Sequence, residues 1–165
     1  MGDAAESVPR QNALTARLLR EQAHAHARRR RHHKDAWLAW TGLISGLLAL
    51  PLAQSTWHGP EVAAILTVAA TALFAGHRWA IAVIVIADLF LLPTVWPRTF
   101  VEGDLASRFV ALVTLAAIVP GVLAMRRAAA VLVLLTGQRR TQEMCRRVHT
   151  GLVAVGVLAV IIPLL

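Results

Sequence analysis

Long runs of hydrophobic residues alternate with short polar segments along most of the chain. An α-helix needs about 20 mostly apolar residues to cross a hydrocarbon core ~30 Å thick. Four runs meet or approach that length: Ala36–Ala53, Glu61–Ala75, Trp79–Trp96 and Leu105–Met125. A fifth run, Gly151–Leu165, is shorter, and it must either include part of the preceding segment CRRVHT or lie in a thinned bilayer. The pattern predicts an all-α fold: a polytopic transmembrane helical bundle of four to five spans.

The connections between the runs refine this prediction. The second and third runs are joined only by GHR, so they form a tight antiparallel hairpin unless the second run is re-entrant. After Arg126 and Arg127 the run AAAVLVLLTG is too short to span a bilayer, and we expect it to lie at the membrane surface. The chain then divides into a basic N-terminal tail (1–35), a four-span bundle (36–125), a basic interfacial segment (126–150) and a fifth span (151–165).

Composition and charge supply the orientation. Of the 165 residues, 57% are hydrophobic and 16% charged, with a formal net charge of +8. Eight of the 17 Lys and Arg precede residue 36. With the N-terminus in the cytoplasm, only Arg98 and Arg108 fall outside or near the outer surface, as the positive-inside rule requires. Five tryptophans lie close to ends of the predicted spans, where their rings prefer the headgroup layer: Trp37, Trp40, Trp57, Trp79 and Trp96.

The cellular setting follows from the same features. The single cysteine, Cys145, excludes an intrachain disulfide. We interpret the first run as a signal-anchor helix rather than a cleaved signal peptide, because further apolar spans follow it. A short, Ala- and Arg-rich, multi-span chain without lipidation signals fits a bacterial inner membrane, with the N-terminus in the cytoplasm and, if the fifth span forms, the C-terminus outside.

One acid interrupts the third run. After its first two residues, the stretch HRWAIAVIVIADLFLLPTVW carries a single charged side chain, Asp88. An acid at mid-bilayer costs about 2.5–3.5 kcal/mol, so it faces protein or water rather than lipid. Folding the second and third runs about GHR places Thr67 opposite Asp88, and helical rise places Arg108 about 7 Å away in depth. We therefore expect Asp88 to be buried, hydrogen-bonded to Thr67 and paired with Arg108.

Two interpretations of this acid stay open. In the first, Asp88 and its partners lock helices together, as isolated intramembrane pairs do in small bundles. In the second, Asp88 takes up a proton or a cation, and Pro93, which cannot donate to the Leu89 carbonyl, gives the helix two shapes. The first predicts a non-enzymatic accessory or scaffold protein, and the second a proton- or ion-conducting or coupling protein.

Small residues recur at a spacing of four in three of the runs, which allows another helix backbone to approach closely. We expect these faces to pack tightly, within the bundle, in a homo-oligomer or against a partner membrane protein. The predicted packing residues are Gly42, Gly46, Ala63, Thr67, Thr71, Ala117 and Gly121.

The basic tail has few helix breakers after Pro9 and is predicted to be helical. Its cations determine topology, and they attract anionic lipid headgroups by about 1 kcal/mol each. The tail can therefore bind membrane lipids or a cytoplasmic partner. Nucleic acid is not expected as a partner, because no aromatic platform accompanies the charge. The cations directly before the first run are Arg28, Arg29, Arg30, Arg31 and Lys34.

No cofactor, metal site or enzyme activity is predicted. The four tail histidines have neighbours one or two positions apart, which do not share a helix face. The chain contains no HExxH, phosphate-binding loop or GxSxG. The segment GLISG resembles the serine motif of intramembrane proteases, but Leu43 stands where that motif needs glycine. The histidines considered are His24, His26, His32 and His33.

Overall fold

The computed structural model describes residues 21, 22, 24, 26, 29, 32–50, 59–101, 104–137 and 141–164. Every regular element in these residues is a helix. The chain divides into two compact units, Met1–Asp35 and Ala36–Leu165. In the first unit, the described residues are helical and nearly all are exposed, as expected for a tail dominated by charge.

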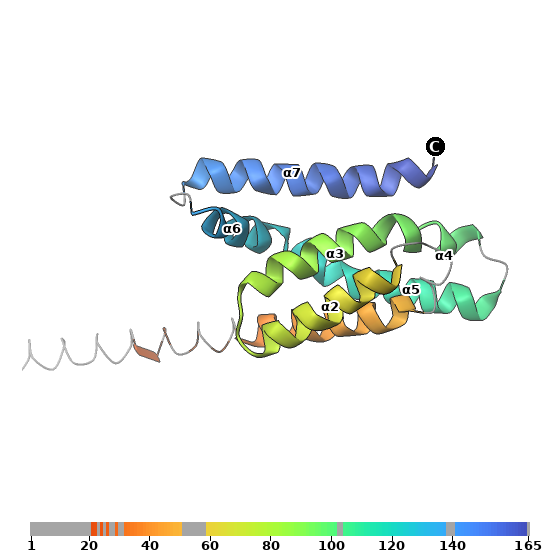
Figure 1. Ribbon diagram of the computed structural model, residues 1–165, viewed down its shortest axis with the longest axis horizontal. Coiled ribbons are helices and arrows are strands. Elements are labelled where there is room, and N and C mark those ends of the chain that lie inside the picture. The colour runs from red at the N-terminus through yellow and green to blue at the C-terminus, as the bar shows by residue number, and fades with distance from the viewer. Residues whose placement is uncertain are drawn as a thin grey trace, which may run out of the picture. The chain divides into compact units, whose positions relative to one another are not determined.

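The second unit is a bundle of helices (Figure 1). Residues 36–50 form its first member, which we call the first bundle helix. Helices α2 and α3 make an antiparallel hairpin, α5 returns along α3, and α7 runs in the same direction as α3 (Figure 1). The remaining elements are α2 (Gly59–Phe74), α3 (Trp79–Val95), α4 (Arg98–Val101), α5 (Leu105–Leu123), α6 (Met125–Leu135), α7 (Gln142–Ile161) and a 3-10 turn (Ile162–Leu164).

The hydrophobic runs coincide closely with the long helices. The largest difference is α7, which begins at Gln142 rather than Gly151 and so includes CRRVHT, giving a helix of 20 residues. By length and composition alone, α5 and α7 are the two helices in the described chain that can cross a membrane. Helices α2 and α3 are apolar but shorter. The structure therefore supports a helical bundle with two candidate membrane spans.

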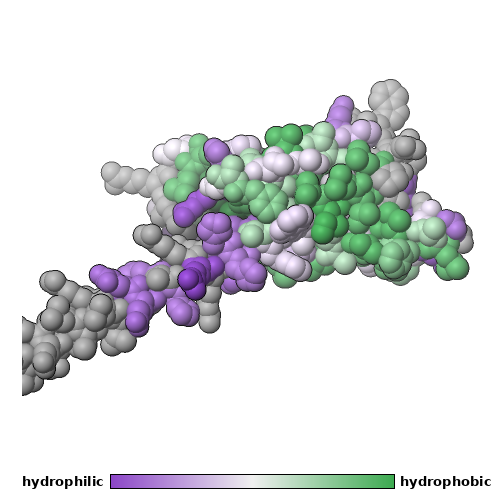
Figure 2. Space-filling model, turned by 90° about the horizontal axis from the view of Figure 1, so that it is seen from below, coloured by the Kyte–Doolittle hydropathy of each residue, from purple (hydrophilic) through white to green (hydrophobic). Residues whose placement is uncertain are grey.

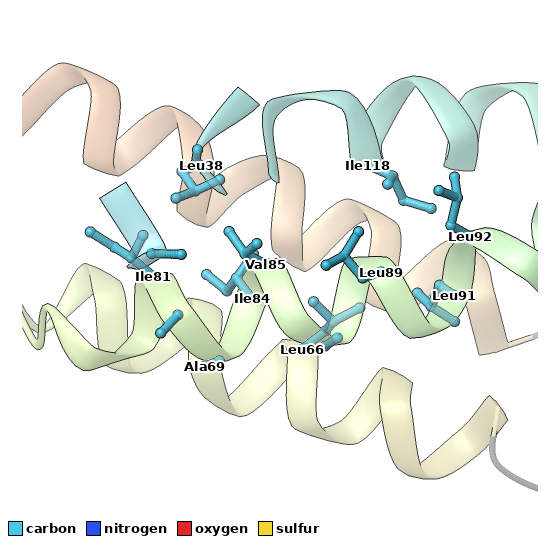
Figure 3. Packing of buried hydrophobic residues seen from close by; sticks show 14 of the residues in the cluster. Leu38, Leu66, Ala69, Ile81, Ile84, Val85, Leu89, Leu91, Leu92 and Ile118 are labelled. Atoms are coloured by element: carbon cyan, nitrogen blue, oxygen red, sulfur yellow. The ribbon is translucent and has the colours of Figure 1, made fainter. Parts of the chain in front are cut away.

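Helix α3 occupies the centre of the bundle. Its residues are apolar on all sides, which is the pattern of a helix surrounded by other helices, and 11 of its 17 residues are buried. In Figure 3, Ile84 and Val85 of α3 lie among side chains from its neighbours, including Leu66 of α2 and Leu38 of the first bundle helix. A polar group in the middle of α3 is consequently held far from the bundle surface.

Helices α5 and α6 are separated by a break at Ala124. The Ala124 N–H bonds back to the carbonyls of Pro120 and Gly121, both at 3.0 Å, while Pro120 itself has no N–H to donate to the preceding turn. The break lies beside the middle of α3, because a Cβ added at Gly156 of α7 would meet both Met125, 3.2 Å away, and Leu89, 3.3 Å away.

Helix α6 corresponds to the short run that was expected to lie on the membrane surface. One face of it packs into the bundle, with Ala128, Ala129 and Val133 buried against the neighbouring helices. The small side chains of Ala128 and Ala129 let it approach α3 and α7 closely. The prediction of a helix was right, and the position of α6 relative to a membrane surface stays a prediction.

The outer surface of the bundle is largely apolar. One face is covered mainly by hydrophobic side chains (green in Figure 2). Helix α7 contributes much of the exposed apolar surface, since only Gly156 and Ala159 of its residues are buried, while Val155 and Leu158 are more than half exposed. A surface of this kind is unfavourable in water and favourable in lipid.

Candidate functional site: a buried carboxyl group

Asp88 is the buried acid of the described bundle. It lies near the middle of α3 and is 1% exposed. The neighbouring turns of α3 supply only apolar side chains, including Ile84, Val85 and Leu92, which are themselves buried. The carboxyl group must therefore find its polar contacts on other helices, because burying a polar group without a hydrogen bond is costly.

Ser45 of the first bundle helix provides one such contact. Its hydroxyl donates to Asp88 Oδ1 at 3.3 Å and also lies 3.1 Å from the carbonyl oxygen of Gly42 on its own helix. A hydroxyl has only one proton, so the carboxyl group and the Gly42 carbonyl share it. Ser45 is fully buried, which keeps this link between α3 and the first bundle helix away from solvent.

Gly121 of α5 closes the other side of the site. A Cβ added at this position would overlap Asp88 Oδ2 and would lie 2.9 Å from Asp88 Cγ. Oδ2 is buried and has no hydrogen-bond partner among the described residues. The carboxyl group is thus held between a serine on one helix and the bare backbone of a glycine on another, next to the α5–α6 break.

The predicted partners of Asp88 are not the observed ones. The hydroxyl of Thr67 donates to the Ala63 carbonyl of its own helix at 2.9 Å. The hydrogen bond to the Asp88 carboxyl group comes from Ser45 instead. Arg108 is 13 residues before Gly121 on α5, which is about 20 Å along the helix axis. An Arg side chain cannot cover that distance, so the predicted Asp88–Arg108 pair is wrong.

The error has a physical origin in the connection between α3 and α5. The prediction assumed a direct reversal, so that residues could be matched in depth by counting from the turn. Helix α4 lies in that connection, and α5 begins farther out. A better signal was present: Ser45 follows Trp37 by eight residues, and Asp88 follows Trp79 by nine. Two helices that start at the same boundary place such residues at equal depth.

Most of the predicted packing residues contact another helix or are buried, and one of them is exposed. Gly42 lies against Ile84, because an added Cβ would be 3.3 Å from that side chain. Gly46 lies against α2, since an added Cβ would be 3.2 Å from the Ala63 carbonyl oxygen and 3.3 Å from Thr67 Oγ1. Ala63 and Ala117 are buried. Thr71 is exposed and its hydroxyl donates to the Val68 carbonyl, so it is not part of the packed stripe within this chain.

The basic tail lies mostly beyond what the structure describes. Of the predicted lipid- or partner-binding cations, Arg28, Arg30 and Arg31 lie outside the described residues, and Arg29 and Lys34 are exposed. Among the described residues there is no group of three or more His, Cys, Asp or Glu side chains placed to hold a metal ion.

Comparisons with protein-family models, with curated protein sequences and with solved structures found no match to this chain. The geometry of the Asp88 site allows two kinds of chemistry. It can join three helices through one side chain, or it can hold a proton on a carboxyl oxygen shielded from water.

Proposed function

We propose that this chain is a small, non-enzymatic integral membrane protein that serves as an accessory or scaffold subunit. The observation that supports this role most directly is the close packing of Asp88 between Ser45 and Gly121. The contact leaves no room for even one added carbon at position 121, which is typical of a group that joins helices rather than one that lines a passage.

In this proposal there are five membrane spans: the first bundle helix, α2, α3, α5 continued by α6, and α7. Trp79 and Trp96 lie 17 residues apart on either side of α3, or about 26 Å along a helix axis, close to the thickness of a hydrocarbon core. Each end also carries a ring pair: Trp40 and Phe74 at 5.4 Å near the start of α3, and Trp96 and Phe100 at 5.0 Å near its end. Aromatic rings at two such levels favour a membrane-spanning position.

Charge supports an orientation with the N-terminus in the cytoplasm of a bacterial cell. Arg78, Arg146 and Arg147 lie at the end of the bundle where α3 and α7 begin. Arg126 and Arg127 follow the break beside the middle of α3 and belong to neither end. Arg98 and Arg108 belong to the opposite side. The excess of Arg at one end is what the positive-inside rule expects for the cytoplasmic side.

A second candidate function is proton or ion coupling through Asp88. It is favoured by one specific observation, that Oδ2 is buried without a hydrogen-bond partner among the described residues, beside the break between α5 and α6. Broken helices near the middle of a membrane are a common setting for ion and proton sites.

Flux measurements separate the two candidates. The purified chain, Asp88→Asn and Glu143→Gln are reconstituted in liposomes, and proton and cation flux is compared with that of empty liposomes. The structural role predicts no flux from any of the three, because Asn keeps the size of Asp88 and can still accept from Ser45. Flux that Asp88→Asn abolishes while Glu143→Gln retains it would establish the coupling function. Glu143 is a suitable control because it is an exposed acid.

A further inference from the structure

The first turns of α7 combine a surface hollow with an arginine that has no partner among the described residues. An open surface hollow of about 380 Å³ is lined by Glu143, Arg146, Arg147 and Thr150. Glu143 accepts a hydrogen bond from Arg147 at 2.6 Å, so the charges of these two side chains compensate each other. The guanidinium of Arg146 forms no hydrogen bond or ion pair with any residue that the structure describes. One positive charge at the hollow is therefore available to an outside anion.

From Arg146 toward the C-terminus of α7, the same side of the helix is apolar and exposed. Val153, Val157 and Ile161 are 41%, 50% and 44% exposed. Together with Arg146 and Thr150 they follow the helical spacing of three and four residues, so all five side chains share one face. We call these five residues the α7 stripe. It runs from a cation through a hydroxyl-bearing residue to a strip of hydrocarbon.

The distance from Arg146 to Val157 matches the acyl-chain depth of one leaflet. These residues are 11 apart, or about 16 Å along the helix. Half of a hydrocarbon core ~30 Å thick is about 15 Å. A phosphate at Arg146 thus places an acyl chain along Val153, with its end near Val157.

We propose that the α7 stripe is a binding site for one anionic phospholipid of the leaflet that faces the bundle's arginine-rich end. Arg146 binds the phosphate, and the apolar part of the stripe receives an acyl chain. Complementary charge and complementary length select this occupant over an uncharged lipid or a second copy of the chain. The inference rests on the proposed membrane location and adds a ligand class to it.

The test measures lipid retained by the full-length protein. Binding of phosphatidylglycerol and of phosphatidylcholine with the same chains is measured by native mass spectrometry after release from detergent. We expect Arg146→Gln to weaken phosphatidylglycerol binding about fivefold, the effect of one near-surface cation. Arg78→Gln is the matched control, since it removes an exposed arginine at the start of α3 that does not line the hollow. It should leave binding unchanged.

A second matched pair tests the apolar half of the stripe. Val157→Ser removes a stripe residue, while Val155→Ser removes an equally exposed valine on the opposite side of α7. Only Val157→Ser should weaken binding. The proposal is overturned if the two arginine variants or the two valine variants behave alike, or if phosphatidylcholine binds as tightly as phosphatidylglycerol.

Two further outcomes have separate meanings. If Val157→Cys in a Cys145→Ser background forms a disulfide-linked dimer in membranes, the stripe is an interface between copies and the lipid site is wrong. If the wild-type chain is removed from membranes by alkaline washing, the proposed membrane location fails, and the lipid site fails with it. A chain that resists washing yet retains no phosphatidylglycerol contradicts the lipid site alone.

Discussion

At the scale of single residues, the contact between Asp88 and Gly121 joins two helices without a hydrogen bond. Gly121 has an ordinary helical conformation, so the glycine is required for space and not for its backbone freedom. The carboxyl group of Asp88 fills that space, and Ser45 binds it from the other side. The position of α5 along α3 is therefore sensitive to a single carbon atom.

Gly121→Ala tests this sensitivity. Because the new Cβ would overlap Asp88 Oδ2, α5 must shift, and we expect the free energy of unfolding to fall by about 1–3 kcal/mol. The measurement is thermal or denaturant unfolding in detergent micelles. In an Asp88→Ala background the overlapping atoms are gone, so the cost of Gly121→Ala should fall by at least half, as for coupled neighbours.

Gly151→Ala is the control for this experiment. Gly151 lies in α7, and an added Cβ there meets nothing within 4 Å. Since alanine favours helices more than glycine by roughly 0.8–1 kcal/mol, this substitution should leave stability unchanged or raise it. Equal costs for Gly121→Ala with and without Asp88 would show that the two residues are not in contact.

Sequence reasoning was correct about the acid but not about its partners. Asp88 was identifiable because one charged residue inside an apolar run must be buried in protein. Ser45, by contrast, is one of several small polar residues in the spans, and its selection depends on which helix lies next to α3. Which helices become neighbours is decided by packing among many apolar surfaces. The spacing of residues along the chain does not encode this choice.

At the scale of elements, two turns depend on glycine for a different reason. Gly76, between α2 and α3, has φ +88°, and Gly137, after α6, has φ +68°, yet neither has an atom within 4 Å of an added Cβ. A side chain at these positions therefore strains the backbone without any steric overlap with neighbours.

Replacing either glycine by alanine should cost about 1–2 kcal/mol, the strain of a left-handed conformation with a Cβ. Asparagine tolerates this conformation better, so Gly76→Asn and Gly137→Asn should lose less stability than the alanine variants. Unfolding in detergent measures all four. Alanine and asparagine variants of equal stability would contradict the positive φ at these turns.

The helix α6 shows where element prediction from sequence reaches its limit. Its run of apolar residues was too short for a span, and a surface position was the simplest expectation. The break at Ala124, beside Pro120 and Gly121, lets α5 end halfway along α3, and α6 continues from there with Ala128 and Ala129 buried. Burial of α6 thus follows from a feature of α5, not from the sequence of α6 itself.

At the scale of the whole molecule, the proposed five spans make a labelling prediction. In a Cys145→Ser background, Ala75→Cys lies at the exposed turn between α2 and α3, and Ala106→Cys lies at the exposed start of α5. A membrane-impermeant maleimide should label position 75 only from the cytoplasmic side and position 106 only from the opposite side, because one span separates the two ends.

Accessible cysteines of this kind are compared in right-side-out and inside-out vesicles. Labelling of both positions from one side would show that α3 does not cross the membrane, and the five-span proposal would fail. The unmodified Cys145→Ser chain, which has no thiol, measures the background.

The extent of the long helices was the best-predicted feature of the described fold. The runs that predicted α2, α3 and α5 end within a few residues of the observed helices, because the hydrophobic length of a helix and its breakers are local properties. The central place of α3 and the loose attachment of α7 were not predicted. Both depend on which apolar surfaces meet, and nearly all the candidate surfaces are chemically alike.

The sparse burial of α7 has a consequence for biosynthesis. Among the residues that the structure describes, all but one of the buried hydrophobic side chains precede α7, and Ala159 is the exception. During translation the chain up to α6 therefore already contains nearly all of the core residues while α7 is still being made. The part of the core that α7 covers, including Met125 and Leu89 beside Gly156, stays open until α7 has been synthesised.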